Sequence, residues 1–234
     1  MAENSQEPRR MHSFLPRGRF TQLLLLLLGM LVLAPLLEAF LHLRLLEDAF
    51  LTAVFIYATY AFSRNKRLLI AAVCLALPAI ALTWLTPLAH LRWLSILGAL
   101  CDVAFILTVT VAILAHIFKQ KDVSADVIAG AIVVYLLMAL MWAQIYWALE
   151  IIRPGQFGIP AGDGPIAPAL LRYFSLVTIT TVGYGDITPL TPVARAFANL
   201  EAVMGQLYLV IQVAWLVGMH VTMKSKQDLM DRKS

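Results

Sequence analysis

Long apolar runs constrain this chain more than any other feature of its sequence. Residues 68–91 and 127–149 contain no Asp, Glu, Lys or Arg, and residues 93–118 and 196–223 contain one such residue each. About 20 apolar residues suffice for a helix to cross the ~30 Å hydrocarbon core of a bilayer. Only 14% of the residues are charged, whereas about 25% are charged in a typical soluble domain. The sequence therefore predicts a multi-pass membrane protein.

Two earlier segments complete the set of apolar runs. Residues 20–41 carry Glu38 as their only charged residue, and the shorter segment 45–62 carries Glu47 and Asp48 near its start. With these two segments the chain has six predicted spans. We expect an all-α membrane protein with six transmembrane helices.

The first span has a second interpretation. Basic residues, a leucine-rich stretch and then small residues also resemble a cleaved signal peptide. The apolar stretch continues to Leu41, and Pro35 lies where cleavage would be expected. These features favour a retained helix, and both alternatives stay open.

The basic residues orient the spans. If six spans alternate, 13 of the 18 basic residues lie on one side: four before the first span, three between the second and third, two after the fourth and four after the sixth. Lys and Arg favour the cytoplasmic side. We expect both termini in the cytoplasm of a cell-membrane protein, with the basic residues facing anionic inner-leaflet lipid. No basic patch interleaved with aromatic residues suggests nucleic acid, and no small-molecule substrate is evident.

A short polar segment interrupts the last two long runs. The stretch TITTVGYGDITP covers residues 178–189, and it follows a segment at 168–180 that is apolar but too short to span a bilayer. Non-helical backbone at membrane depth is tolerated only where protein or water surrounds it. Gly183 and Gly185 can adopt the dihedrals that point consecutive carbonyls toward one axis. We therefore expect a re-entrant loop that lines an aqueous path.

This segment resembles a known ion filter. Residues 180–186 read TTVGYGD and closely resemble the selectivity filter of the tetrameric potassium-channel family. The resemblance implies a passive K⁺-selective channel in which K⁺ is the only bound species and no other cofactor is needed. It assigns the K⁺ ligands to the carbonyl oxygens of Thr181, Val182, Gly183 and Tyr184 and to the Thr181 hydroxyl, with Gly185 completing the filter and with Tyr173, Thr180 and Asp186 supporting it. With one motif per chain, a homotetramer around one pore is implied.

The resemblance covers residues 126–223. Together with the polar and apolar runs, it predicts a cytoplasmic tail at 1–19, a four-helix transmembrane domain at 20–118, a pore domain at 119–223 and a second cytoplasmic tail at 224–234. Within the pore domain, an outer helix is followed by the pore helix, the filter and the inner helix. Ser124 and Thr191 are predicted N-caps of the outer and inner helices, and Pro192 suits a first helical position.

The inner helix carries candidate gating residues. Gly205 lies twenty residues after Gly185, which matches the spacing of the family's hinge glycine. The alternative role is close helix packing, which is common for glycine in membranes, and both roles stay open. Leu209 and Val213 extend the same face and are predicted to form an apolar gate. Glu201 is expected to bond the pore helix, and the resemblance also implies a hydrogen bond from Tyr173 to Asp186.

The fourth span lacks the residues of a voltage sensor. Sensors of the family carry several basic residues on this helix, whereas this one has only Arg92, at its outer end. Moving one charge through 100 mV supplies only about 2.3 kcal/mol, so steep gating needs several charges per subunit. We expect a channel without conventional voltage sensing.

One acid lies in the middle of the fourth span. Asp102 is a functional candidate because ionisable residues within the membrane are costly. The alternative is a carboxyl group bonded to Ser95, Thr108 or a neighbouring helix.

Three other function classes fit less well. Potassium-uptake transporters that resemble this chain carry several filter repeats, whereas this chain has one. An enzyme is not indicated, because no metal-ligand cluster, nucleophile with a base or phosphate-binding loop is present. A nonselective cation channel would usually alter Val182, Tyr184 or the second glycine.

Overall fold

The computed structural model describes residues 18–41, 46–61, 66–89, 91–120, 123–159 and 167–231. Its helices are α1 (Arg19–Leu41), α2 (Leu46–Ala61), α3 (Lys66–Ala89), α4 (Arg92–Ile117), α5 (Ala125–Ile152), α6 (Pro168–Ile179) and α7 (Pro192–Asp231), and two short strands are β1 (Phe157–Gly158) and β2 (Thr188–Pro189). Most of the predicted tail at 1–19 lies outside the described residues, as do the side chains of Glu38 and Glu47.

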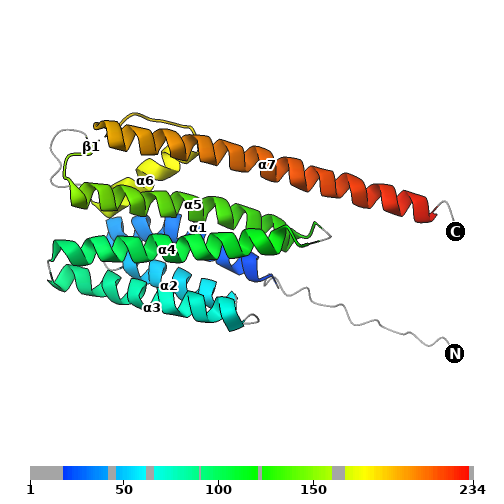
Figure 1. Ribbon diagram of the computed structural model, residues 1–234, viewed down its shortest axis with the longest axis horizontal. Coiled ribbons are helices and arrows are strands. Elements are labelled where there is room, and N and C mark those ends of the chain that lie inside the picture. Colours follow the sequence, from blue (N-terminus) through cyan, green and yellow to red (C-terminus); the bar gives the residue numbers. More distant parts are fainter. Residues whose placement is uncertain are drawn as a thin grey trace, which may run out of the picture.

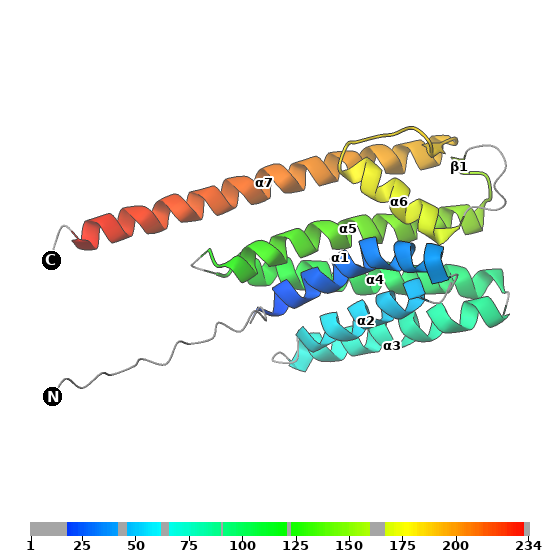
Figure 2. The ribbon, with the colours of Figure 1, turned by 180° about the vertical axis from the view of Figure 1, so that it is seen from behind.

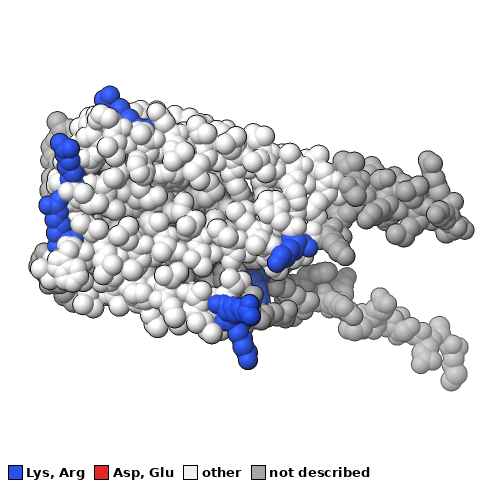
Figure 3. Space-filling view, viewed as in Figure 1, with Lys and Arg blue, Asp and Glu red and all other residues white. Residues whose placement is uncertain are grey.

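The described chain is mostly helical, as predicted, and it is built for a membrane. Five helices, α1, α3, α4, α5 and α7, are long and apolar enough to cross a bilayer. The second predicted span, 45–62, forms only the 16-residue helix α2, which is about 24 Å long at 1.5 Å per residue. Lys and Arg lie near the two ends of the face in Figure 3, with a broad uncharged band between them.

Helix α5 lies at the centre of the molecule. Helices α1 to α4 pack on one side of it, and α6 and α7 lie on the other (Figure 1). Helix α4 packs between α3 and α5, while α1 contacts both α2 and α5. The main hydrophobic core is formed by apolar side chains of α1 to α5. The start of α1 and the end of α7 lie at the same end of the molecule, as expected for an even number of crossings.

Both predicted N-caps are present. The Ser124 hydroxyl accepts a hydrogen bond from the Val127 amide at 3.3 Å, and Thr191 accepts one from the Ala194 amide at 3.2 Å. Helix α7 continues to Asp231, past the predicted end of the span at residue 223. The residues after Gly218 include no further glycine or proline, and Lys, Gln, Met and Leu favour helix. The helix therefore has no signal to stop where its apolar run ends.

The first turn of α5 holds the start of α1. One carboxylate oxygen of Asp126 accepts hydrogen bonds from the amides of Phe20 and Thr21 and from the Thr21 hydroxyl, at 3.0 to 3.1 Å. A negative charge is favourable at a helix N-terminus, where amides lack partners within the helix. Gly18 makes the approach possible, because a Cβ there would lie 2.0 Å from the same oxygen. The four-helix side is thus tied to the outer helix of the predicted pore domain.

Candidate ion pore and selectivity filter

Helix α6 runs only part of the way through the molecule. It starts at the end where α5 finishes, ends midway along α7, and the chain then returns to the end where α7 begins (Figures 1 and 2). Pro168 starts α6 at a first helical position, where its missing N–H costs nothing. Strands β1 and β2 pair antiparallel and place Phe157 opposite Pro189. This pairing joins the segment before α6 to the segment that follows residues 180–186, which we call the glycine motif.

Aromatic side chains fix α6 against α5. The rings of Tyr146, Phe157 and Phe174 meet edge to face, with centroids 5.2 to 5.3 Å apart. All three residues are buried. Aromatic pairs in this geometry stabilise a fold by about 0.5–1.5 kcal/mol beyond their buried area. The short helix is therefore held against α5 by packing near its middle.

The backbone after α6 alternates in conformation. Thr181, Gly183 and Gly185 have φ of 60°, 58° and 79°, whereas Val182 and Tyr184, which lie between them, do not have positive φ. Such alternation turns successive peptide groups so that their carbonyls can share one side. A Cβ at Gly183 or Gly185 would meet nothing within 4 Å. On the single chain, glycine is therefore favoured there by the dihedral and not by lack of space.

The amides of this segment are tied back to α6. The carbonyl oxygen of Val177 accepts hydrogen bonds from the amides of Val182 at 3.0 Å and Gly183 at 3.3 Å, and the Thr181 amide bonds Thr178 at 2.9 Å. The Thr180 hydroxyl donates to the Leu176 carbonyl at 2.6 Å. These bonds occupy donors at the base of the segment and hold it to the last turn of α6.

The glycine motif is exposed to solvent on the single chain. All residues from 180 to 186 are exposed, including 54% of Val182 and 70% of Tyr184. An exposed irregular backbone cannot face lipid at membrane depth, because its polar groups would have no partners. In a bilayer this segment needs water or other protein chains around it.

Tyr173 and Asp186 support the segment from behind. The Tyr173 hydroxyl donates a hydrogen bond to Asp186 Oδ2 at 2.8 Å, which is the contact expected from the family resemblance. The ring of Tyr173 stacks on Tyr184 with 6.4 Å between centroids. Asp186 Oδ1 accepts a bond from the Ile187 amide at 3.0 Å. The acid thus links α6 to the C-terminal end of the glycine motif.

A buried network joins α5, α6 and α7. Glu201 is fully buried, and its two carboxyl oxygens lie 2.5 Å from the hydroxyls of Tyr146 and Ser175. The predicted bond from Glu201 to the pore helix is therefore confirmed. Sequence reasoning missed Tyr146 and Ser175, although a hydroxyl within an apolar helix is a signal that a polar partner lies nearby.

Gly205 lets α7 pass close to the end of α6. A Cβ at this position would lie 2.5 Å from Ile179 Cγ1 and 2.9 Å from the Ile179 carbonyl oxygen. The same carbonyl accepts a hydrogen bond from the Tyr135 hydroxyl at 2.9 Å. These distances support the packing role of Gly205, and α7 stays helical through it. The hinge role stays a prediction, as does the gate at Leu209 and Val213, whose side chains are exposed on the single chain.

Arg92 has a structural partner. Its Nε donates to the Ile151 carbonyl at 2.6 Å, and its Nη2 donates to the Ile152 carbonyl. These are the last residues of α5, where carbonyls lack partners within the helix and a positive charge is favourable. The one basic residue of the fourth predicted span therefore caps a neighbouring helix.

Thr108, one of the alternative partners suggested for Asp102, bonds elsewhere. The Thr108 hydroxyl donates instead to the Ala104 carbonyl of its own helix, at 2.8 Å. Asp102 Oδ1 is buried and has no hydrogen-bond partner among the described residues. The Thr108 alternative is therefore not confirmed, because a threonine in a helix can satisfy its hydroxyl one turn back.

Comparison with known proteins finds similarity to ion channels. Residues 166–220 match a family model described as "Ion channel". The chain is 40% identical over 80 residues to "Two pore potassium channel c" of Oryza sativa subsp. japonica, which covers 34% of this chain and 16% of that protein. It is 34% identical over 99 residues to "Two-pore potassium channel 5" of Arabidopsis thaliana, covering 42% of this chain and 22% of that protein. These similarities favour a potassium channel over an enzyme.

The similarity is limited in extent. The chain spans less than a quarter of the length of either relative, at 16% and 22%. The family match contains α6, the glycine motif and the apolar part of α7. No solved structure matches this chain significantly.

Proposed function

We propose that this protein is a potassium-selective channel that conducts K⁺ passively across the cell membrane. The observation that carries the proposal is the alternating backbone of Thr181, Gly183 and Gly185 within an exposed TVGYG segment. Carbonyl oxygens arranged along one axis can replace the water shell of a K⁺ ion. The similarity to two proteins named as potassium channels points the same way.

The K⁺ ligands in this proposal are backbone carbonyls. Thr181, Val182, Gly183 and Tyr184 supply one carbonyl each, and Thr181 adds its hydroxyl. The amides of Thr181, Val182 and Gly183 are engaged by α6, so donor groups at the base of the segment are drawn away from the ion path. Asp186 and Tyr173 keep the outer end of the segment in place through their hydrogen bond.

Four copies of the chain surround the pore in this proposal. One chain holds one glycine motif, and its exposed backbone needs protein or water around it. Helix α7 also supports an oligomer. Four of its apolar side chains are more than half exposed on the single chain: Val203, Leu207, Val210 and Val217. Exposed apolar side chains like these suit contacts with other helices of an oligomer as well as with lipid. A cyclic tetramer covers the motif and leaves a path on its axis.

The remaining parts follow the predicted order. The four-helix domain is 20–118 and the pore domain is 119–223, with six crossings and both termini in the cytoplasm. Voltage is not the main stimulus in this proposal, because Arg92 is engaged in capping α5. The four-helix domain instead contacts the pore domain through Asp126 at one end and Arg92 at the other.

A matched pair of glycine variants tests the proposal. Gly185 and Gly155 both have positive φ, 79° and 89°, and in both cases a Cβ would meet nothing within 4 Å. The two variants therefore impose the same kind of strain, but only Gly185 lies in the proposed filter. In liposomes with a K⁺ gradient, Gly185→Ala should abolish K⁺-selective flux, whereas Gly155→Ala should retain it. Equal flux in both variants would contradict the proposal.

A further inference from the structure

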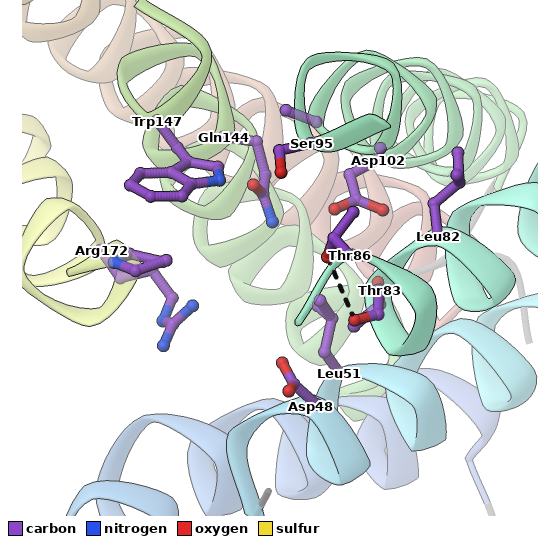
Figure 4. A pocket seen from close by; sticks show the side chains of 13 residues that line it. Asp48, Leu51, Leu82, Thr83, Thr86, Ser95, Asp102, Gln144, Trp147 and Arg172 are labelled. Atoms are coloured by element: carbon purple, nitrogen blue, oxygen red, sulfur yellow. Dashed lines mark hydrogen bonds between the residues drawn. The ribbon is translucent and has the colours of Figure 1, made fainter. Parts of the chain in front are cut away.

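A cavity of about 340 Å³ lies away from the filter, at the end of the bundle where α2, α4 and α6 begin and α3 and α5 finish. It is lined by residues from all five of these helices. Figure 4 shows their side chains around a common space, with Asp102 and Arg172 on opposite sides. None of residues 180–186 lines it. The cavity is therefore separate from the proposed ion path.

One of the buried residues that line this cavity is an acid. Asp102 is only 6% exposed, and its Oδ1 atom has no hydrogen-bond partner within the described part of the chain. Its carboxyl group points into the cavity (Figure 4). A buried carboxyl group without a partner is costly, and a positively charged donor would offset that cost. The site is thus built to receive a cation or a strong hydrogen-bond donor.

The hydroxyls beside Asp102 also present acceptors. The Thr83 hydroxyl donates to the Ala79 carbonyl at 3.0 Å, and the Thr86 hydroxyl lies 3.5 Å from the Thr83 carbonyl. Because these protons are directed to carbonyls of their own helix, the oxygen lone pairs are the groups left for the cavity. Ser95 and Gln144 add two more polar side chains to the lining. The wall around Asp102 therefore favours a ligand that donates several hydrogen bonds.

The volume of the cavity and its apolar lining residues restrict the kind of ligand that fits. A volume of about 340 Å³ is within the range of small-molecule sites and far exceeds a bare metal ion. Leu51, Leu82 and Trp147 supply apolar surface. The charged lining residues are Asp48, Asp102 and Arg172. When all three are ionised the lining has a net charge of −1, which favours a ligand with one positive charge over a ligand with two.

We propose that this cavity binds a small organic ammonium ion. Its N–H groups donate to Asp102 and to the neighbouring hydroxyl oxygens, and its short carbon chain lies against Leu51, Leu82 and Trp147. Pro168 and Arg172 of α6 line the same cavity, so the occupant contacts the helix that leads into the glycine motif. The proposal for this site does not depend on the proposed channel function, because binding of the ligand can be measured without ion flux.

Binding calorimetry on the full-length purified protein tests the site, with n-propylammonium as the probe in K⁺ buffer. We expect saturable binding that is weakened about tenfold or more by Asp102→Asn, as expected for the loss of one charge-assisted hydrogen bond. Thr110→Val is the matched control, because Thr110 lies on the same helix, is 5% exposed and also has an unpartnered oxygen among the described residues, but does not line the cavity. This control should bind as the wild type does.

Three results would overturn the proposal. The first is equal affinity in Asp102→Asn and wild type, which would place the probe elsewhere, for example in the pore. The second is equally tight binding of n-propanol, which would leave only an apolar cavity. The third is displacement of the probe by Ca²⁺ in wild type but not in Asp102→Asn, which would assign the site to an inorganic cation. If Asp102→Asn does not fold, Ser95→Phe decides, because its ring takes up part of the cavity and should weaken binding while Asp102 remains.

Discussion

Replacing Gly205 with alanine should weaken the contact between α7 and the end of α6. The added Cβ would lie 2.9 Å from the Ile179 carbonyl oxygen and 2.5 Å from Ile179 Cγ1. The side-chain atom can rotate away, but the carbonyl belongs to the backbone and also accepts the Tyr135 hydrogen bond. Helix α7 or the end of α6 must therefore shift to make room.

The size of the effect follows from a comparison with Gly218, which lies on the same helix. A Cβ at Gly218 would meet nothing within 4 Å. Both alanine variants gain roughly 1 kcal/mol from helix propensity. Only Gly205→Ala also overpacks a contact, which costs about 1–3 kcal/mol. The difference between the two variants isolates the clash, so Gly205→Ala should be less stable than Gly218→Ala by about 1–3 kcal/mol per chain.

The free energy of unfolding of both purified variants, measured by denaturant titration, tests this reasoning. Flux in liposomes gives a second readout, and it should fall in Gly205→Ala because the end of α6 leads into the glycine motif. Equal stability of the two variants would refute the packing argument. If Gly205→Ala were as stable as Gly218→Ala but changed gating, Gly205 would act as a hinge instead.

Three other substitutions have defined outcomes. Tyr173→Phe removes the hydrogen bond to Asp186, worth about 1 kcal/mol, and should lower the permeability ratio of K⁺ to Na⁺; an unchanged ratio would contradict a supporting role. Tyr146→Phe keeps the aromatic packing but leaves a buried oxygen of Glu201 without its donor. It should lower the free energy of unfolding by about 1–3 kcal/mol, and wild-type stability would argue against the network. Arg92→Gln weakens the cap of α5 and should lower the melting temperature without changing the steepness of the current–voltage curve. A change in steepness would show that Arg92 senses voltage.

The helices were predictable because their signals are local. The apolar runs place α1, α3, α4, α5 and α7, and the caps at Ser124 and Thr191 are read directly from their side chains. The φ values at Gly183 and Gly185 were predictable for the same reason, since glycine adopts such dihedrals at little cost. Two helices differ from the prediction. The second predicted span forms only the 16-residue helix α2, and α7 continues to Asp231 because the residues after its apolar run still favour helix.

The contacts between helices could not be predicted, because each depends on how distant segments meet. Glu201 signalled a polar partner, but nothing in the sequence selects Ser175 and Tyr146 among the hydroxyls available. The bonds from α1 to Asp126 span more than one hundred residues of chain. The cavity around Asp102 likewise arises only where five helix ends come together.

The central claim is that residues 181 to 185 form a filter that selects K⁺. The most direct test is the reversal potential of the purified protein in a planar bilayer, with K⁺ salt on one side and Na⁺ salt at equal concentration on the other. A K⁺-selective filter predicts a large reversal potential whose sign corresponds to K⁺ leaving its own side. A reversal potential near zero in the presence of protein-dependent current would show that the pore does not select K⁺, and it would contradict the account.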